Sequence, residues 1–115
     1  MSVFTDVAQF MVACDQTVDH SNYDQCRLYI DLITEELKEL QVAQEDTEAL
    51  DAVCDLIWVL TGYAYSCGWD VSRAWDEVAR SNMGKIMPDG KVHKRADGKV
   101  QKPQSWTPPD LAGCV

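Results

Sequence analysis

Apolar residues recur every three or four positions along the first 83 residues of the chain. Because this spacing places them on one face of an α-helix, it predicts four helices. Their approximate ranges are 4–14, 23–43, 47–66 and 71–83. Polar, turn-prone segments separate the first three helices, and Ser21 or Asn22 is expected to cap the second one.

The third predicted helix is apolar almost all round, which is typical of a helix buried on more than one side. After Gly84 the helical pattern stops. The sequences PDGK and ADGK predict turns, and PQSWTPPD cannot be helical because proline lacks an amide donor. We therefore predict an all-α fold, in which a four-helix bundle-like core with an irregular C-terminal tail is completed by homo-oligomerisation.

A length of 115 residues predicts a single domain, with residues 1–86 as its helical part and residues 87–115 as its basic, proline-rich tail. The net charge of −9 is unevenly divided. Residues 1–79 carry 16 acidic and 3 basic side chains, whereas residues 80–115 carry 3 and 7. The acidic part repels nucleic-acid phosphates, so we expect no nucleic-acid partner. Acidic side chains that bind divalent cations, followed by a basic tail, suit a small phosphorylated ligand, although a plainly solvated acidic surface explains the charge as well.

The chain contains no apolar run of the ~20 residues that a membrane span requires. Its N-terminal sequence also lacks the basic start and apolar core of a secretion signal, so we expect a cytoplasmic protein without a membrane partner. The five cysteines are widely spread and never form a C-x-x-C pair, which favours neither a disulfide framework nor a zinc site. We expect most of them to lie in the core.

Carboxylates interrupt the apolar pattern of the second and third helices. On the second helix Glu36 and Glu39 fall in a stripe that borders the core, with Glu35 one step round. On the third helix Asp51 and Asp55 occur where there is almost no polar face. Buried charge is costly without a partner, and only three basic residues precede residue 80. A bound metal ion therefore explains these acids better than a solvated surface does.

The ligand types favour a hard cation. All candidate donors are oxygens, which suits Mg²⁺, with Mn²⁺ as a possible substitute. The only two histidines, His20 and His93, fall in predicted loops, so the Glu-x-x-His pattern of a di-iron bundle is absent.

The sequence EELKE at residues 35–39, followed by DAVCD at residues 51–55, resembles the E-E-x-x-E … E-x-x-D pattern of the all-α nucleoside triphosphate pyrophosphatases. The segments LIWVLTGYAYSCGWD, AWDEVARSNMGK and DGKVQKPQSWTPPDL are similar to the small, phage-type MazG-like branch related to phosphoribosyl-ATP pyrophosphohydrolase. The likeness covers nearly the whole chain. One position departs from the pattern, because Ala52 stands where the family usually has Glu; Asp51 or Glu48 then supplies the fourth ligand.

The resemblance implies a metal-dependent pyrophosphohydrolase, which cleaves the bond between the α- and β-phosphates of a nucleotide. It implies that residues 1–86 are a catalytic helical domain, and that the protein is a homodimer or homotetramer. The implied metal ligands are Glu36, Glu39, Asp51 and Asp55, and the implied catalytic residues are Glu35, Glu36 and Glu39. The implied substrate contacts are Asn82, Lys85, Gln16 and Lys91. A purine deoxynucleoside triphosphate such as dGTP is the expected substrate.

Two other interpretations stay open. The substrate could be phosphoribosyl-ATP. Alternatively, the chain could be a non-catalytic helical oligomerisation module with a vestigial acid cluster, and its stability would then be indifferent to Mg²⁺.

Overall fold

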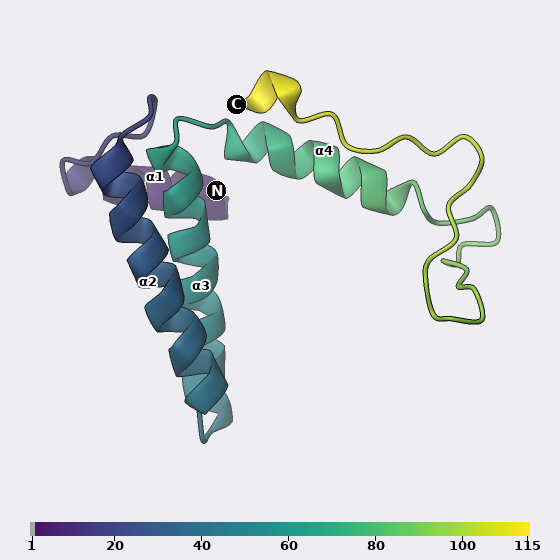
Figure 1. The fold of residues 1–115 in the computed structure, drawn as a ribbon, viewed down its shortest axis with the longest axis horizontal. Helices are drawn as coiled ribbons and strands as arrows, with labels where there is room; N and C mark the ends of the chain where they lie inside the picture. Colours follow the sequence, from purple (N-terminus) through teal and green to yellow (C-terminus); the bar gives the residue numbers. More distant parts are fainter. Residues whose placement is uncertain (1) are drawn as a thin grey trace. The chain divides into compact units, whose positions relative to one another are not determined.

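The computed structural model describes residues 2–115 and is all-helical, as predicted (Figure 1). Within that range it contains no strand, only two isolated β-bridges. Four α-helices are followed by one short 3₁₀ helix: α1 (Val3–Ala13), α2 (Tyr23–Val42), α3 (Asp46–Ser66), α4 (Val71–Met83) and η1 (Ala112–Cys114). The helix bounds agree with the sequence prediction to within about one residue.

The chain divides into two compact units, one holding the chain up to Val71 together with Val115, and the other Ser72–Cys114. The predicted single domain, with a boundary between helical part and tail at residue 86, stays a prediction, as does homo-oligomerisation. None of the helices in residues 2–115 is long and apolar enough to cross a membrane.

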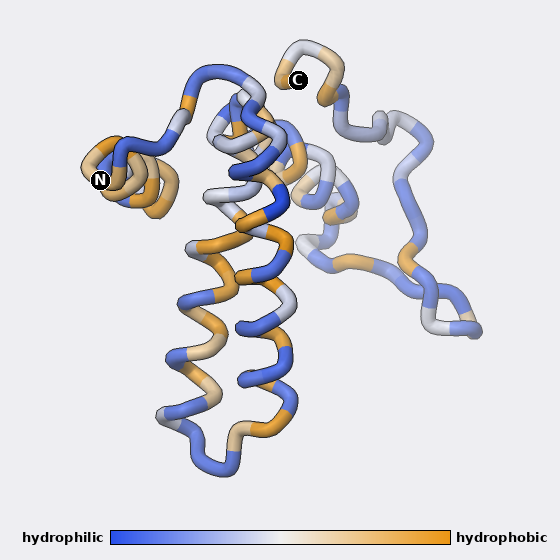
Figure 2. The backbone as a smooth tube through the Cα atoms, turned by 60° about the vertical axis from the view of Figure 1, so that its left-hand side comes forward, coloured by the Kyte–Doolittle hydropathy of each residue, from blue (hydrophilic) through white to orange (hydrophobic). Residues whose placement is uncertain are grey.

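In the first unit α2 and α3 run side by side, joined by a short turn (Figures 1 and 2), and α1 packs against α3. Local sequence fixes where two of these helices begin. The Ser2 hydroxyl accepts a hydrogen bond from the backbone amide of Thr5 at 3.2 Å, and the Asn22 side chain accepts one from that of Gln25 at 3.1 Å. Of the two predicted caps for α2, the structure therefore uses Asn22.

The core of the first unit forms where all three helices meet. Val7 and Met11 of α1 are fully buried against Tyr29 of α2 and Val59 of α3. The ring of Tyr29 lies against Gly62, where an added Cβ would collide with the ring. Gly62 therefore permits α2 and α3 to approach closely, even though glycine is unfavourable within a helix.

A buried polar cluster joins α2 to α3 and to the connector after α1, at one end of the α2–α3 pair. The Gln25 side-chain amide donates to the carbonyl oxygen of Thr17 at 2.7 Å and to the Ser66 hydroxyl at 2.8 Å. Its side-chain oxygen accepts from the Thr17 amide at 3.0 Å. Because every polar atom of this buried amide group has a partner, burying it carries little penalty.

The exposed surface of α3 differs from the prediction of a helix buried on more than one side. Hydrophobic and hydrophilic positions alternate along α2 and α3 (Figure 2). On α3 one apolar stripe is 38–64% exposed, and it consists of Leu50, Val53, Ile57 and Leu60. Apolar periodicity identifies a helical face, but it does not say whether the same chain covers that face.

The prediction that most cysteines lie in the core was partly wrong, since Cys14 and Cys54 are exposed.

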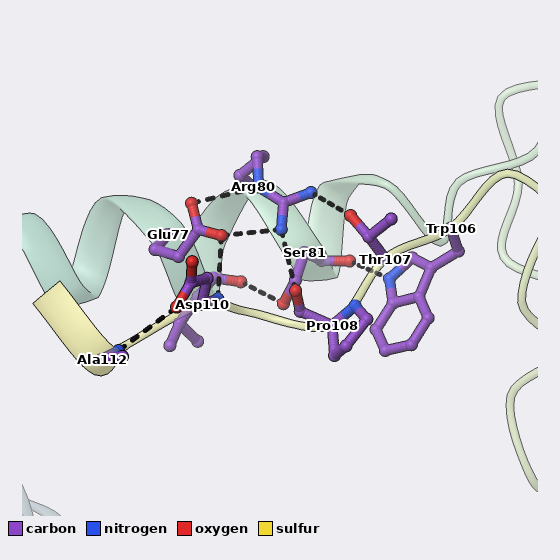
Figure 3. Close-up of polar contacts among 9 residues, drawn as sticks. Glu77, Arg80, Ser81, Trp106, Thr107, Pro108, Asp110 and Ala112 are labelled. Atoms are coloured by element: carbon purple, nitrogen blue, oxygen red, sulfur yellow. Dashed lines mark hydrogen bonds and ion pairs between the residues drawn. The ribbon is translucent and has the colours of Figure 1, made fainter.

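In the second unit the tail is bound along α4 (Figure 3). The Trp106 indole donates to the carbonyl oxygen of Ser81 at 2.7 Å. Arg80 pairs with Glu77 at 2.8 Å and donates to the carbonyl oxygen of Pro108 at 3.1 Å. Earlier in the tail the ADGK turn brings Lys94 opposite Val100 in an isolated bridge. The tail is irregular, as predicted, but specific hydrogen bonds order it.

Candidate metal centre

Three carboxylates converge between α2 and α3. One oxygen each from Glu36, Glu39 and Asp55 lies within 4.8 Å of the others. The i, i+3 spacing puts the two glutamates on the same face of α2, and the side-by-side packing of α3 brings Asp55 to that face. In residues 2–115 this is the one group of three or more acidic, cysteine or histidine side chains with a geometry suited to holding a metal ion.

The electrostatics of Glu36 show that the cluster holds more negative charge than the fold compensates. Burial, as the largest cause, and the neighbouring carboxylates of Glu39, Asp55 and Asp51 raise its pKa to about 7 from the ordinary 4.5. The pKa of Asp55 is raised too, first by burial and then by the charges of Asp51 and Glu39. Clustered carboxylates with raised pKa values are typical of functional sites.

The donor set fits a divalent hard cation. The Oε2 atom of Glu36 is buried and has no hydrogen-bond partner in the described chain. An unpaired buried carboxylate oxygen is costly, and a cation between the carboxylates would remove both that cost and the repulsion. All three donors are carboxylate oxygens, which is the chemistry that Mg²⁺ and Mn²⁺ prefer.

The other predicted acidic residues, Asp51, Glu35 and Glu48, are exposed. None of these three residues belongs to the three-carboxylate group, the predicted ligand Asp51 included. The charge of Asp51 nevertheless acts on both Glu36 and Asp55. The effect of Asp51 on both partly buried acids favours Asp51 over Glu48 as the fourth ligand. That assignment stays a prediction, as does the catalytic role of Glu35.

The predicted substrate contacts fall in both units. Gln16 lies in the connector after α1, where its side-chain oxygen accepts a hydrogen bond from the Tyr29 hydroxyl at 2.7 Å. In the second unit the Lys85 amine donates to the Asn82 side-chain oxygen at 3.0 Å and lies 5.7 Å from the ring centroid of Trp106. Lys91 is exposed, directly after the turn at residues 88–90. Their contacts with a substrate stay predictions.

Sequence reasoning missed how the tail is held on α4. Glu77 accepts hydrogen bonds from the Arg80 guanidinium and, at 3.0 Å, from the backbone amide of Asp110. These bonds lower the pKa of Glu77 to about 2, the Arg80 bond having the largest effect. The i, i+3 spacing of Glu77 and Arg80 was a visible signal for the ion pair, but nothing in the sequence indicated its tail partners. Lys102 was missed as well, and its amine lies 4.3 Å from the Trp106 ring centroid.

The sequence of the chain was compared with models of known protein families. A model of the phosphoribosyl-ATP pyrophosphohydrolase family matches residues 13–82. The chain belongs to this family. The matched range covers α2, α3 and nearly all of α4, so it includes the three-carboxylate centre. Membership in this phosphoribosyl-ATP pyrophosphohydrolase family confirms the resemblance seen in the sequence, and it indicates pyrophosphohydrolase activity on a nucleotide. Among curated proteins, none matches the chain.

Proposed function

We propose that this protein is a Mg²⁺-dependent nucleotide pyrophosphohydrolase that cleaves the bond between the α- and β-phosphates. The observation that carries the proposal is the convergence of Glu36, Glu39 and Asp55 within 4.8 Å, with one buried carboxylate oxygen lacking a partner. The family match supports the reaction class. An acidic centre by itself would repel a triphosphate, so the proposal requires a cation at this place.

In this proposal Glu36, Glu39, Asp55 and Asp51 hold the cation. When bound, Mg²⁺ would neutralise phosphate charge and acidify a water molecule. Glu35 is exposed one position from Glu36, on the same helix. Its carboxylate would orient the attacking water and accept its proton, which is the work of a general base. Mn²⁺ is expected to substitute, because it takes the same oxygen ligands.

Phosphate binding is proposed for two lysines, as the family resemblance implies. Lys85 is half-buried beside Asn82 and Trp106, so its amine is held in place rather than freely mobile. A fixed cation is useful where negative charge develops during phosphoryl transfer. We assign the same phosphate-binding role to Lys91, and a contact with the base or sugar to Gln16.

Base recognition is proposed for a small pocket between α1 and α3. The pocket is lined by Val3, Asp6, Cys54, Ile57 and Trp58, and Cys54 is next to Asp55 in the sequence. Trp58 already makes an edge-to-face contact with Phe10 at a centroid distance of 5.5 Å. An aromatic ring beside an apolar pocket offers a surface on which a base can stack.

The proposed reaction has two candidate substrates. A purine deoxynucleoside triphosphate such as dGTP follows from the resemblance to the phage-type branch. The family model is named for phosphoribosyl-ATP pyrophosphohydrolase, and this favours phosphoribosyl-ATP equally. Both reactions break the same bond and need the same carboxylate centre.

We also propose that the protein works as a homodimer or homotetramer. The exposed apolar stripe of α3 supports this proposal, because Leu50 and Leu60 are 64% and 53% exposed. Their spacing along α3 with Val53 and Ile57 is that of a helix–helix seam. A second copy of the chain would remove this apolar surface from water.

The test is a chromatographic product assay with Mg²⁺ on the eight common NTPs and dNTPs and on phosphoribosyl-ATP. Wild type is compared with Glu39→Gln, and Glu45→Gln serves as a control that removes one exposed charge outside the centre. We expect a monophosphate and pyrophosphate from wild type and from Glu45→Gln, with a loss of at least about 100-fold in Glu39→Gln.

Other products separate the alternatives. Release of free phosphate and a diphosphate would mean cleavage at the γ-position and contradict the proposed reaction. Turnover of phosphoribosyl-ATP alone would establish the second substrate. No turnover of any of these nucleotides would favour the non-catalytic oligomerisation module.

A further inference from the structure

Two cysteines far apart in sequence face each other at one end of the α2–α3 pair. Cys26 lies in the first turn of α2, and Cys67 caps the C-terminal end of α3. Their sulfur atoms are 3.5 Å apart, and both residues are half-buried. Neither cysteine belongs to the carboxylate centre or to the proposed substrate contacts, so this pair is unexplained by the proposed function.

The backbone around the pair is fixed from both sides. Ser21 and Cys67 form an antiparallel bridge, and the Asn22 amide donates to the Ser66 carbonyl oxygen at 2.8 Å. These bonds hold the start of α2 beside the end of α3. The buried hydrogen bond between the Gln25 side chain and the Ser66 hydroxyl ties the same two helix ends together. The two thiols are therefore held as neighbours by contacts that do not depend on the sulfur atoms.

We propose that Cys26 and Cys67 are an oxidative modification site, where hydrogen peroxide converts the two thiols into a reversible intramolecular disulfide. In the first step the Cys26 sulfur attacks one peroxide oxygen. The O–O bond breaks, a sulfenic acid forms on Cys26, and the other oxygen leaves as water with the thiol proton. In the second step the Cys67 sulfur attacks the Cys26 sulfur. The S–S bond forms, the S–O bond breaks, and the hydroxyl leaves as water with the Cys67 proton.

The two steps together oxidise two thiols with one molecule of peroxide. Two electrons pass from the two sulfurs to peroxide, which is reduced to two water molecules. Burial is the largest cause that raises the pKa of the Cys67 thiol, so this group carries little thiolate at neutral pH. In the proposed sequence of steps the first attack is assigned to Cys26 and the resolving step to Cys67.

The disulfide would close a loop of about 40 residues that contains most of α2 and α3. Such a link restricts the unfolded chain, and a loop of this length predicts a rise in Tm on the order of 10 °C for a domain of this size. The carboxylate centre lies away from this end, since Glu36 is ten residues along α2 from Cys26, or about 15 Å. We therefore expect oxidation to stabilise the helix pair without changing metal binding.

The experiment uses the full chain treated with a small excess of hydrogen peroxide, then denatured, alkylated and mapped by peptide mass spectrometry. A Cys14→Ser/Cys54→Ser background removes the two exposed thiols. We expect the Cys26 and Cys67 peptides to be cross-linked, with the loss of two hydrogens and a rise in Tm that dithiothreitol reverses. In this background Cys67→Ser should abolish the rise in Tm and leave a sulfenic acid on Cys26 that dimedone traps.

Two results would overturn the proposal. One is alkylation of both Cys26 and Cys67 after peroxide treatment, with no cross-linked peptide. The other is oxidation that ends in sulfinic acid on either cysteine, or in links between chains, with no reversible rise in Tm.

Discussion

Replacing Glu36 by glutamine should stabilise the metal-free protein above neutral pH. The fold raises the pKa of Glu36 from 4.5 to about 7, which corresponds to an upper bound of about 3 kcal/mol of unfavourable free energy once the carboxyl is ionised. Water screens part of this repulsion because the residue is not fully buried, so we expect Glu36→Gln to gain about 1–2 kcal/mol at pH 8. For a domain of this size that gain raises Tm by roughly 5–10 °C.

The sign of the pH dependence follows from the raised pKa. Between pH 4.5 and about 7 the folded state binds a proton that the unfolded state has lost. The stability of the metal-free wild type therefore falls as pH rises through this range. The Gln variant lacks this contribution, so the difference between the two proteins should be largest at pH 8 and close to zero at pH 4.5.

The assay is thermal unfolding with a chelator, and then with increasing Mg²⁺. Wild type should gain Tm with each increase in Mg²⁺, since the cation binds only the folded state. Glu36→Gln should respond much less. Asp31→Asn is a matched control, because it removes an exposed charge of α2 outside the centre. The reasoning is refuted if Glu36→Gln destabilises the metal-free protein at pH 8 and Mg²⁺ raises the Tm of both proteins equally.

Three further predictions concern the fold. Gly62→Ala should cost about 1–3 kcal/mol in urea unfolding, because the new methyl group collides with the ring of Tyr29; an unchanged midpoint would contradict the close helix approach. Gln25→Ala should lower the free energy of unfolding by about 1–3 kcal/mol through its lost buried hydrogen bonds, measured by the same method. Because hydrogen bonds, chiefly from Arg80, hold the pKa of Glu77 near 2, its stabilising effect is present above about pH 4.5 and is lost as pH falls toward 2. The stability difference between wild type and Glu77→Gln should shrink over that range, and a constant difference would refute the assignment.

The helices and the centre of the site could be predicted because their signals are local. Apolar spacing, together with caps such as Asn22, determines where each helix begins and ends. Glu36 and Glu39 share a helix face by their i, i+3 spacing, and Asp55 is unusual as a charge in an apolar helix. The three-carboxylate group follows from these patterns once α2 and α3 pack side by side.

The remaining features depend on the register between segments, which no local pattern reports. Cys26 and Cys67 are 41 residues apart, so their contact appears only when the two helix ends are aligned. Arg80 donates hydrogen bonds to Thr107 and Pro108 of the tail, which lie 27 and 28 positions away in the sequence. No local pattern singles out Gly62, although its lack of a side chain decides how closely the helices pack.

The measurement that tests the central claim most directly is a titration of Mn²⁺ followed by electron paramagnetic resonance. Free Mn²⁺ in solution gives a strong paramagnetic resonance signal, and this signal decreases when the ion binds to the protein. Wild type and Asp31→Asn should remove Mn²⁺ from solution at a whole-number ratio to protein, and Mg²⁺ should release it. A variant with Glu36, Glu39 and Asp55 all changed to the corresponding amides should leave the signal of free Mn²⁺ unchanged, while remaining helical by circular dichroism. Equal Mn²⁺ binding by this variant, or none by wild type, would contradict a metal centre between α2 and α3.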